Sequence, residues 1–133
     1  MIVLDASAAV EWLLQTPKAP RVESRLLAST PTTGLCHAPH LIDLEVTQAL
    51  RRLVASGGLR AARAKAALDD LQDLPLIRYP HDFLLPRIWE LRHNLSAYDA
   101  AYVALAESLE SPLVTCDARI RKARGHHARV DVV

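Results

Sequence analysis

Three aspartates stand where an α/β fold would bring carboxylates together. Asp5 directly follows the apolar run Ile2–Leu4, and Asp117 closely follows the apolar run Leu113–Thr115. Short, unbroken apolar runs are typical of strands buried on both faces of a parallel sheet, and such sheets bind ligands at the carboxyl edge. Asp99 falls in the first turn of the helix expected to feed the Leu113–Thr115 strand. We therefore expect all three side chains to lie at one edge of the sheet.

Glu45 is the fourth acid of interest. It lies about one and a half turns into a helix expected over 39–55, roughly 8 Å from the helix start at 1.5 Å per residue. Its neighbours three and four positions away are mostly apolar, and an isolated buried charge is costly. A purely structural role is easier to imagine for the aspartates, since Asp5 and Asp117 are placed to cap helices and Asp99 is spaced from Ser96 as in a capping box.

Convergence of four carboxylates predicts a chemistry. Two carboxylates ~5 Å apart repel by about 3 kcal/mol at an effective dielectric of about 20. No Lys or Arg lies within four residues of Asp5, Glu45 or Asp99 to relieve this repulsion. Oxygen ligands favour Mg²⁺ or Mn²⁺ over Zn²⁺, and two such ions about 3.5–4 Å apart can hydrolyse a phosphodiester without a Ser, Cys or His nucleophile.

The surrounding elements predict how these acids are positioned. Apolar strands alternate with helices, which predicts a three-layer α/β/α sandwich around a mainly parallel sheet of four to five strands, in a single domain spanning 1–133. The expected strands are Ile2–Leu4, 34–38, Leu76–Tyr79, Leu113–Thr115 and 130–133. The expected helices are 7–14 with Ser7 as N-cap, a short segment around Val22, Leu26 and Leu27, 39–55 opened by Pro39, 59–71, 82–93, 96–110 and a short basic helix after Asp117.

Composition and charge limit the remaining choices. The chain has 133 residues, 50% of them hydrophobic, but no apolar run reaches the ~18 residues of a membrane span. The N-terminus lacks the basic segment of a secretory signal, and Cys36 and Cys116 are far apart in sequence, so we expect a cytoplasmic protein with free thiols and no membrane partner. The net charge of +1 predicts no overall affinity for nucleic acid, yet basic residues that could contact RNA phosphates follow Asp117: Arg119, Arg121, Lys122 and Arg124.

Three segments carry a resemblance to a known family. MIVLDASAAVEWLL contains Asp5, HLIDLEVTQALRRLV contains Glu45, and LSAYDAAYVALAESLESPLVTCDARIRKA contains Asp99 and Asp117. Together and in this order they resemble the PIN domain, specifically the VapC toxin ribonucleases of prokaryotic toxin–antitoxin systems.

The resemblance implies a Mg²⁺- or Mn²⁺-dependent endoribonuclease that cuts structured RNA such as tRNA or rRNA. It implies that Asp5, Asp99 and Asp117 hold metal, that Glu45 binds metal or orients the attacking water, and that the hydroxyls of Ser7 and Thr115 lie next to the ligands. It also implies a homodimer, and a toxin–antitoxin hetero-oligomer with a VapB-type antitoxin. The segment 59–73 and the pair His126-His127 follow the family less closely, and their roles stay open.

Two alternatives remain. The first is a non-catalytic module of the same fold that binds RNA or protein without cutting it. The second is a phosphoaspartate protein, either a receiver domain or a haloacid-dehalogenase-like phosphatase using Asp5; the phosphatase pattern has a second Asp two residues later, where this chain has Ser7. Zinc at His37 and His40, or at His126-His127, is disfavoured because no Cys or His cluster accompanies them.

Overall fold

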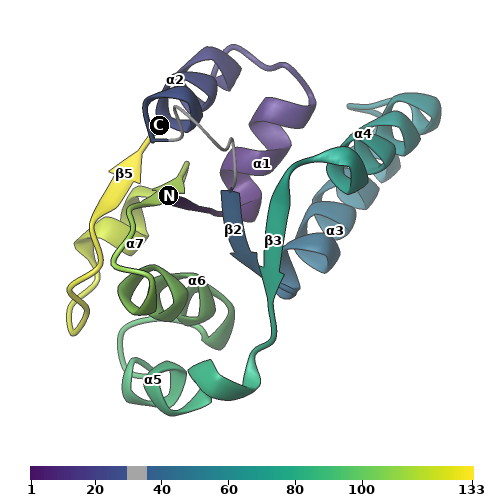
Figure 1. Cartoon of the computed structure of the whole chain (residues 1–133). Helices are drawn as coiled ribbons and strands as arrows, with labels where there is room; N and C mark the ends of the chain where they lie inside the picture. Colours follow the sequence, from purple (N-terminus) through teal and green to yellow (C-terminus); the bar gives the residue numbers. More distant parts are fainter. Residues whose placement is uncertain (30–35) are drawn as a thin grey trace.

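The computed structural model describes residues 1–29 and 36–133, and within them a parallel five-stranded sheet forms the centre (Figure 1). The strands are β1 (Ile2–Leu4), β2 (Cys36–Pro39), β3 (Leu76–Tyr79), β4 (Leu113–Thr115) and β5 (Val130–Val132). Their order is β3-β2-β1-β4-β5, and every pairing is parallel. β1 and β4 are therefore central neighbours, which matters because an acid follows each of them.

Helices cover both faces of the sheet. They are α1 (Ala6–Leu13), α2 (Ala19–Ser29), α3 (Leu41–Ala55), α4 (Ala61–Asp73), α5 (Leu85–Glu90), α6 (Ala97–Ser108) and α7 (Ala118–Lys122), with a 3₁₀ turn, η1 (Asp82–Leu84), before α5. Figure 1 shows α1, α3 and α4 grouped on one side, where α1 contacts α2 and α3, and α5 and α6 grouped on the other. The expected α/β sandwich is confirmed, with all five strands parallel.

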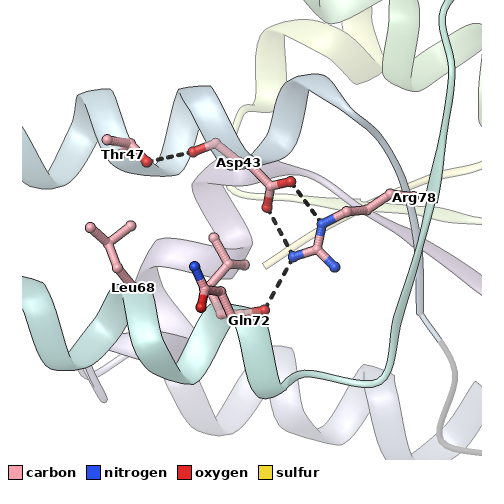
Figure 2. Close-up of a pocket in the computed structure, with 6 residues that line it drawn as sticks. Asp43, Thr47, Leu68, Gln72 and Arg78 are labelled. Atoms are coloured by element: carbon pink, nitrogen blue, oxygen red, sulfur yellow. Dashed lines mark hydrogen bonds and ion pairs between the residues drawn. The ribbon is translucent and has the colours of Figure 1, made fainter.

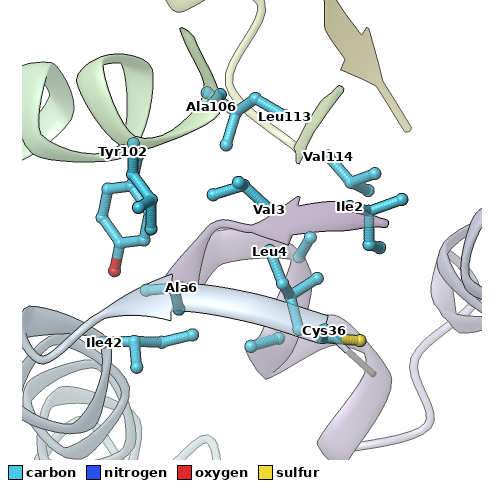
Figure 3. Close-up of a cluster of buried hydrophobic side chains, with 14 of the residues drawn as sticks. Ile2, Val3, Leu4, Ala6, Cys36, Ile42, Tyr102, Ala106, Leu113 and Val114 are labelled. Carbon is cyan, nitrogen blue, oxygen red and sulfur yellow. The ribbon is translucent and has the colours of Figure 1, made fainter. Parts of the chain in front are cut away.

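The core is built on β1 and α6. All three residues of β1 are fully buried, as are Leu113 and Val114 in the neighbouring strand (Figure 3). On α6 every residue from 100 to 106 is buried, four of them alanines. Because alanine has a small side chain, the helix can approach β1 and β4 closely, and Tyr102 fills the remaining space.

Three expected boundaries are wrong, each for a local reason. Ser7 is not the N-cap of α1, because Asp5 takes that position and the Ser7 hydroxyl bonds elsewhere. Pro39 does not open α3 but ends β2, and α3 begins at Leu41. The helix expected over 82–93 is divided, because Pro86 lacks an N–H and suits only the first turn of α5.

The other expected elements agree within a few residues. The expected strand over 34–38 is observed as β2 from Cys36, while its first two residues lie outside the described part of the chain. Both cysteines are free thiols. In the part of the chain that the structure describes, none of the helices has the length and apolar character needed to cross a membrane.

Candidate active site

Two adjacent strand ends position the first pair of acids. Asp5 follows β1, and its backbone N–H donates to the Val114 carbonyl at 3.0 Å, so its backbone is fixed to β4. Asp117 follows β4 by two residues. Because Leu4 pairs with Val114 in parallel register, both carboxylates leave the sheet at its carboxyl edge.

Two hydroxyl groups hold the Asp5 carboxylate, whose residue is only 6% exposed. Asp5 Oδ2 accepts hydrogen bonds from Ser7 Oγ at 2.7 Å and from Thr115 Oγ1 at 2.6 Å. Thr115 Oγ1 in turn accepts from the Asp117 N–H at 3.0 Å, and Ser7 Oγ accepts from the Cys116 N–H at 2.9 Å. The two hydroxyls therefore connect the end of β1 to the loop that carries Asp117.

Helix starts position the other two acids. Asp99 lies in the first turn of α6, where its N–H donates to Ser96 Oγ at 3.1 Å, the N-cap contact that the sequence predicts. Glu45 lies about one turn into α3 and is half-buried. Its Oε2 accepts a hydrogen bond from the Tyr102 hydroxyl of α6 at 2.8 Å.

Electrostatic coupling shows that the acids share one environment. Burial raises the pKa of Asp5, and the hydrogen bonds from Thr115 and Ser7 only partly offset this increase. Burial also raises the pKa of Glu45, and the charges of Asp5 and Asp99 raise it further. The pKa of Asp99 is raised by burial first and then by the charges of Asp5 and Asp117. These carboxylates are thus close enough for each to disfavour ionisation of the next.

Asp117 differs because it has a cationic partner. Arg119 Nη2 lies 2.6 Å from Asp117 Oδ2, and the hydrogen bonds from that guanidinium lower the pKa of Asp117. The Arg119 N–H also donates to Asp117 Oδ1, so Asp117 caps α7 as well. Of the basic residues expected to contact RNA, Arg119 therefore already binds an acid, whereas Arg121, Lys122 and Arg124 are exposed.

The four acids fit a hard divalent cation by chemistry. They offer only oxygen ligands, and three of them carry mutual repulsion that a cation would relieve. Across residues 1–29 and 36–133, no three Asp, Glu, His or Cys side chains are already arranged around a single point as metal ligands. A cation would therefore have to draw the carboxylates closer together than they lie in this structure.

Two pockets lie along α3 and α4, and none of the four acids lines either of them. Figure 2 shows the first, of about 400 Å³, where Arg78 binds Asp43 through Nε at 2.8 Å and Nη2 at 2.9 Å. Arg78 Nη2 also donates to the Leu71 carbonyl of α4. This ion pair joins α3, α4 and β3, and it fixes the turn of α3 that leads to Glu45.

Tyr102 is the residue in contact with an acid that the sequence reasoning missed. It follows Asp99 by three positions, which places both on neighbouring turns of α6. Its environment is also acidic: burial and then the charges of Glu45 and Asp5 raise the pKa of Tyr102 far above its usual range. The helical spacing from Asp99 was the one signal that could have identified it.

Comparison with known proteins follows from this geometry. The PIN domain profile matches residues 2–125. Ribonuclease VapC9 of Mycobacterium tuberculosis (strain ATCC 25618 / H37Rv) is 48% identical over 120 residues, covering 90% of this chain and 88% of the relative. Ribonuclease VapC12 of the same strain is 40% identical over 133 residues, covering 100% and 99%.

Solved structures agree with the fold. PAE2754 from Pyrobaculum aerophilum superposes with a TM-score of 0.68 at 25% identity, over 98% of this chain and 83% of the other. VapC20 from Mycobacterium tuberculosis, described as a sarcin–ricin loop cleaving toxin, superposes with a TM-score of 0.66 at 18% identity, over 96% and 97%.

A parallel α/β sandwich with acids at its carboxyl edge and a matching profile defines a PIN domain. The chain belongs to the PIN domain family and, within it, to the VapC ribonucleases, the endoribonuclease toxins of toxin–antitoxin systems. The resemblance drawn from the sequence is confirmed. The relatives are ribonucleases, and nothing in them supports the phosphoaspartate alternative.

Proposed function

We propose that the four acids form the catalytic centre of this ribonuclease. Asp5, Asp99 and Asp117 hold Mg²⁺ or Mn²⁺, and Glu45 binds metal or orients the attacking water. The observation that supports this assignment is the mutual increase in pKa among Asp5, Glu45 and Asp99, because such a cluster is relieved by a divalent cation.

Each side chain has a defined task in this mechanism. When bound, the metal supplies a water of lowered pKa and stabilises the charge that grows on the scissile phosphate and its leaving oxygen. Ser7 and Thr115 hold Oδ2 of Asp5, which limits the directions in which that carboxylate can bind. Asp117 exchanges its bond to Arg119 for the metal, which frees the Arg119 guanidinium to bind a phosphate of the RNA.

The substrate is a structured RNA, tRNA or rRNA, recognised through its backbone and shape. Exposed basic side chains follow the acids on α7, and only 5% of the residues are aromatic, so the chain has few side chains on which bases could stack. Its partner is a VapB-type antitoxin, and the chain works as one PIN domain over 1–133, as a homodimer and in a hetero-oligomer with that antitoxin. RNA as substrate and the free thiols favour the cytoplasm as its compartment.

Cleavage of total cellular RNA by the parent and by Asp5→Asn tests the assignment. We expect the parent to cut in Mg²⁺, to stop in EDTA and to recover with added Mg²⁺, and Asp5→Asn to lose activity by about 10²–10³-fold. Asp70→Asn, which changes an exposed acid on α4, is the matched control and should cut like the parent. If Asp5→Asn cuts as well as the parent, the acids are not the catalytic centre. If the parent binds RNA without cutting it, the non-catalytic alternative is correct.

A further inference from the structure

One buried hydrogen bond connects two of the acid-bearing helices. The Tyr102 hydroxyl of α6 donates to Glu45 Oε2 of α3 at 2.8 Å, and Tyr102 itself is 0% exposed. In Figure 3 the ring extends from α6 with its hydroxyl toward the side where Ala6 and Ile42 lie. The bond therefore spans the carboxyl edge of the sheet, from the helix of one acid to the helix of another.

We propose that Tyr102 is a positioning residue for Glu45, and that its hydroxyl holds the carboxylate so that Oε1 is directed to metal or water. The inference rests on the proposed function, in which Glu45 acts on one of these two. It assigns a role to a side chain outside the set of four acids.

The need for such a residue follows from the surroundings of Glu45. The charges of Asp5 and Asp99 repel its carboxylate from the site, and no Lys or Arg pairs with it in the described residues. A glutamate also has three side-chain torsions, so without a fixed donor its carboxylate would rotate away from like charges. A hydrogen bond to a charged acceptor is stronger than a neutral one, so a single hydroxyl can hold this orientation.

Tyr102 is a rigid donor. Its ring packs in the core among the buried residues of α6, and a tyrosine side chain has two torsions. A merely structural tyrosine would need only some partner for its hydroxyl. The two roles differ in one measurable respect: a positioning role affects metal binding and turnover, and a structural role affects folding stability alone.

Tyr102→Phe removes only the hydroxyl and tests the proposal. We expect the Mn²⁺ dissociation constant, measured by electron paramagnetic resonance titration without RNA, to rise about 10-fold, as when a group that orients a metal ligand is lost. We expect kcat for RNA cleavage to fall by about 10-fold while KM for RNA stays within about twofold. Tyr79→Phe is the matched control, because its hydroxyl contacts His37 Nδ1 at 2.8 Å and none of the four acids; its Mn²⁺ affinity should equal that of the parent.

A double-mutant cycle shows whether Tyr102 acts through Glu45. In a Glu45→Ala background, Tyr102→Phe should change the Mn²⁺ dissociation constant by less than about twofold, since the bond is already absent. An equal change in both backgrounds, or parent-like Mn²⁺ affinity and kcat in Tyr102→Phe alone, would overturn the proposal. If Tyr102→Phe does not fold, Glu45→Asp replaces it: the shorter side chain cannot reach the hydroxyl, and parent-like Mn²⁺ affinity would be the contrary result.

The parent separates this inference from the proposed function. If the parent neither binds Mn²⁺ nor requires a divalent ion to cut RNA, the metal-dependent function fails and this inference fails with it. If the parent behaves as proposed and only the Tyr102 variant is unchanged, the inference alone is wrong.

Discussion

Asp99 shows most clearly what burial does to a single carboxylate at this site. Burial is the main reason for its raised pKa, the charges of Asp5 and Asp117 add to it, and the bond from Ser96 and the charge of Arg119 oppose it. In the metal-free protein an ionised Asp99 is therefore less favourable when folded than when unfolded. That cost is removed by a proton, by a cation or by replacement with a neutral side chain.

Asp99→Asn should therefore stabilise the metal-free protein at neutral pH. A group whose pKa is raised on folding contributes stability below its unfolded value, 3.8 here, and that stability is lost as the pH rises through the folded value. At pH 7 we expect Asn to gain on the order of 1 kcal/mol after solvent screening, or about 3–5 °C in Tm. The gain should shrink as the pH falls toward 4, where the parent is protonated.

Differential scanning fluorimetry at pH 4–8 in EDTA measures this difference. Saturating Mn²⁺ should reverse the order, because the parent binds the ion more tightly. A variant that is clearly less stable than the parent at pH 7 in EDTA would indicate that Asp99 serves mainly as a helix cap.

At the scale of elements, an ion-pair network fixes the segment after α7. Arg87 of α5 donates through Nε to Glu107 of α6 at 2.7 Å and through Nη2 to the Gly125 carbonyl at 2.9 Å, and the His127 N–H donates to Glu107 at 2.9 Å. Burial alone would raise the pKa of Glu107, yet these hydrogen bonds lower it. The pair His126-His127 thus has a structural role, with the His126 ring also bonded to the Ile120 carbonyl of α7.

Arg87→Met should lower stability by about 2 kcal/mol, or roughly 6–9 °C in Tm, because it leaves Glu107, whose side chain is 6% exposed, without its main partner. Lys65→Met is the matched control: its pair with Asp69 on α4 is exposed, and its loss should change Tm by less than about 2 °C. Thermal unfolding of both variants provides the comparison. Equal effects would show that the Arg87 network adds no more than a surface ion pair.

The elements that carry the acids were predictable from local signals, and the contacts between them were not. The apolar strands with Asp5 and Asp117 at their ends follow from hydrophobic pattern, and Ser96 follows from helix-capping chemistry. Ser7 was assigned to a cap because serine favours caps, but the nearby Asp5 took its hydroxyl instead. Tyr102 and Glu45 are 57 positions apart, and no local pattern indicates that their side chains meet.

The whole molecule combines a near-neutral charge with a local basic surface. The net charge is +1, yet Arg121, Lys122 and Arg124 lie exposed next to the acidic edge. Long-range attraction of RNA by the whole protein is therefore weak, and the basic side chains close to the acids would provide the affinity.

Replacing Arg121 and Lys122 together with Ser should weaken RNA binding without loss of fold. We expect KM to rise about 10-fold and the salt dependence of binding to decrease by one to two phosphate contacts, roughly 0.7–0.9 in slope for each. Arg60→Ser with Lys65→Ser, which changes exposed charges at the start of α4, is the control of equal charge. The same change in slope in both double variants would mean that α7 makes no special contact.

The central claim is that four carboxylates distant in sequence gather around divalent ions. The most direct measurement is an anomalous difference map from crystals soaked in Mn²⁺. The account predicts a peak at the carboxyl edge of β1 and β4, bounded by oxygens of Asp5 and Asp99, with Asp117 released from Arg119. A map with no peak there, or with the acids turned away from any bound ion, would contradict it.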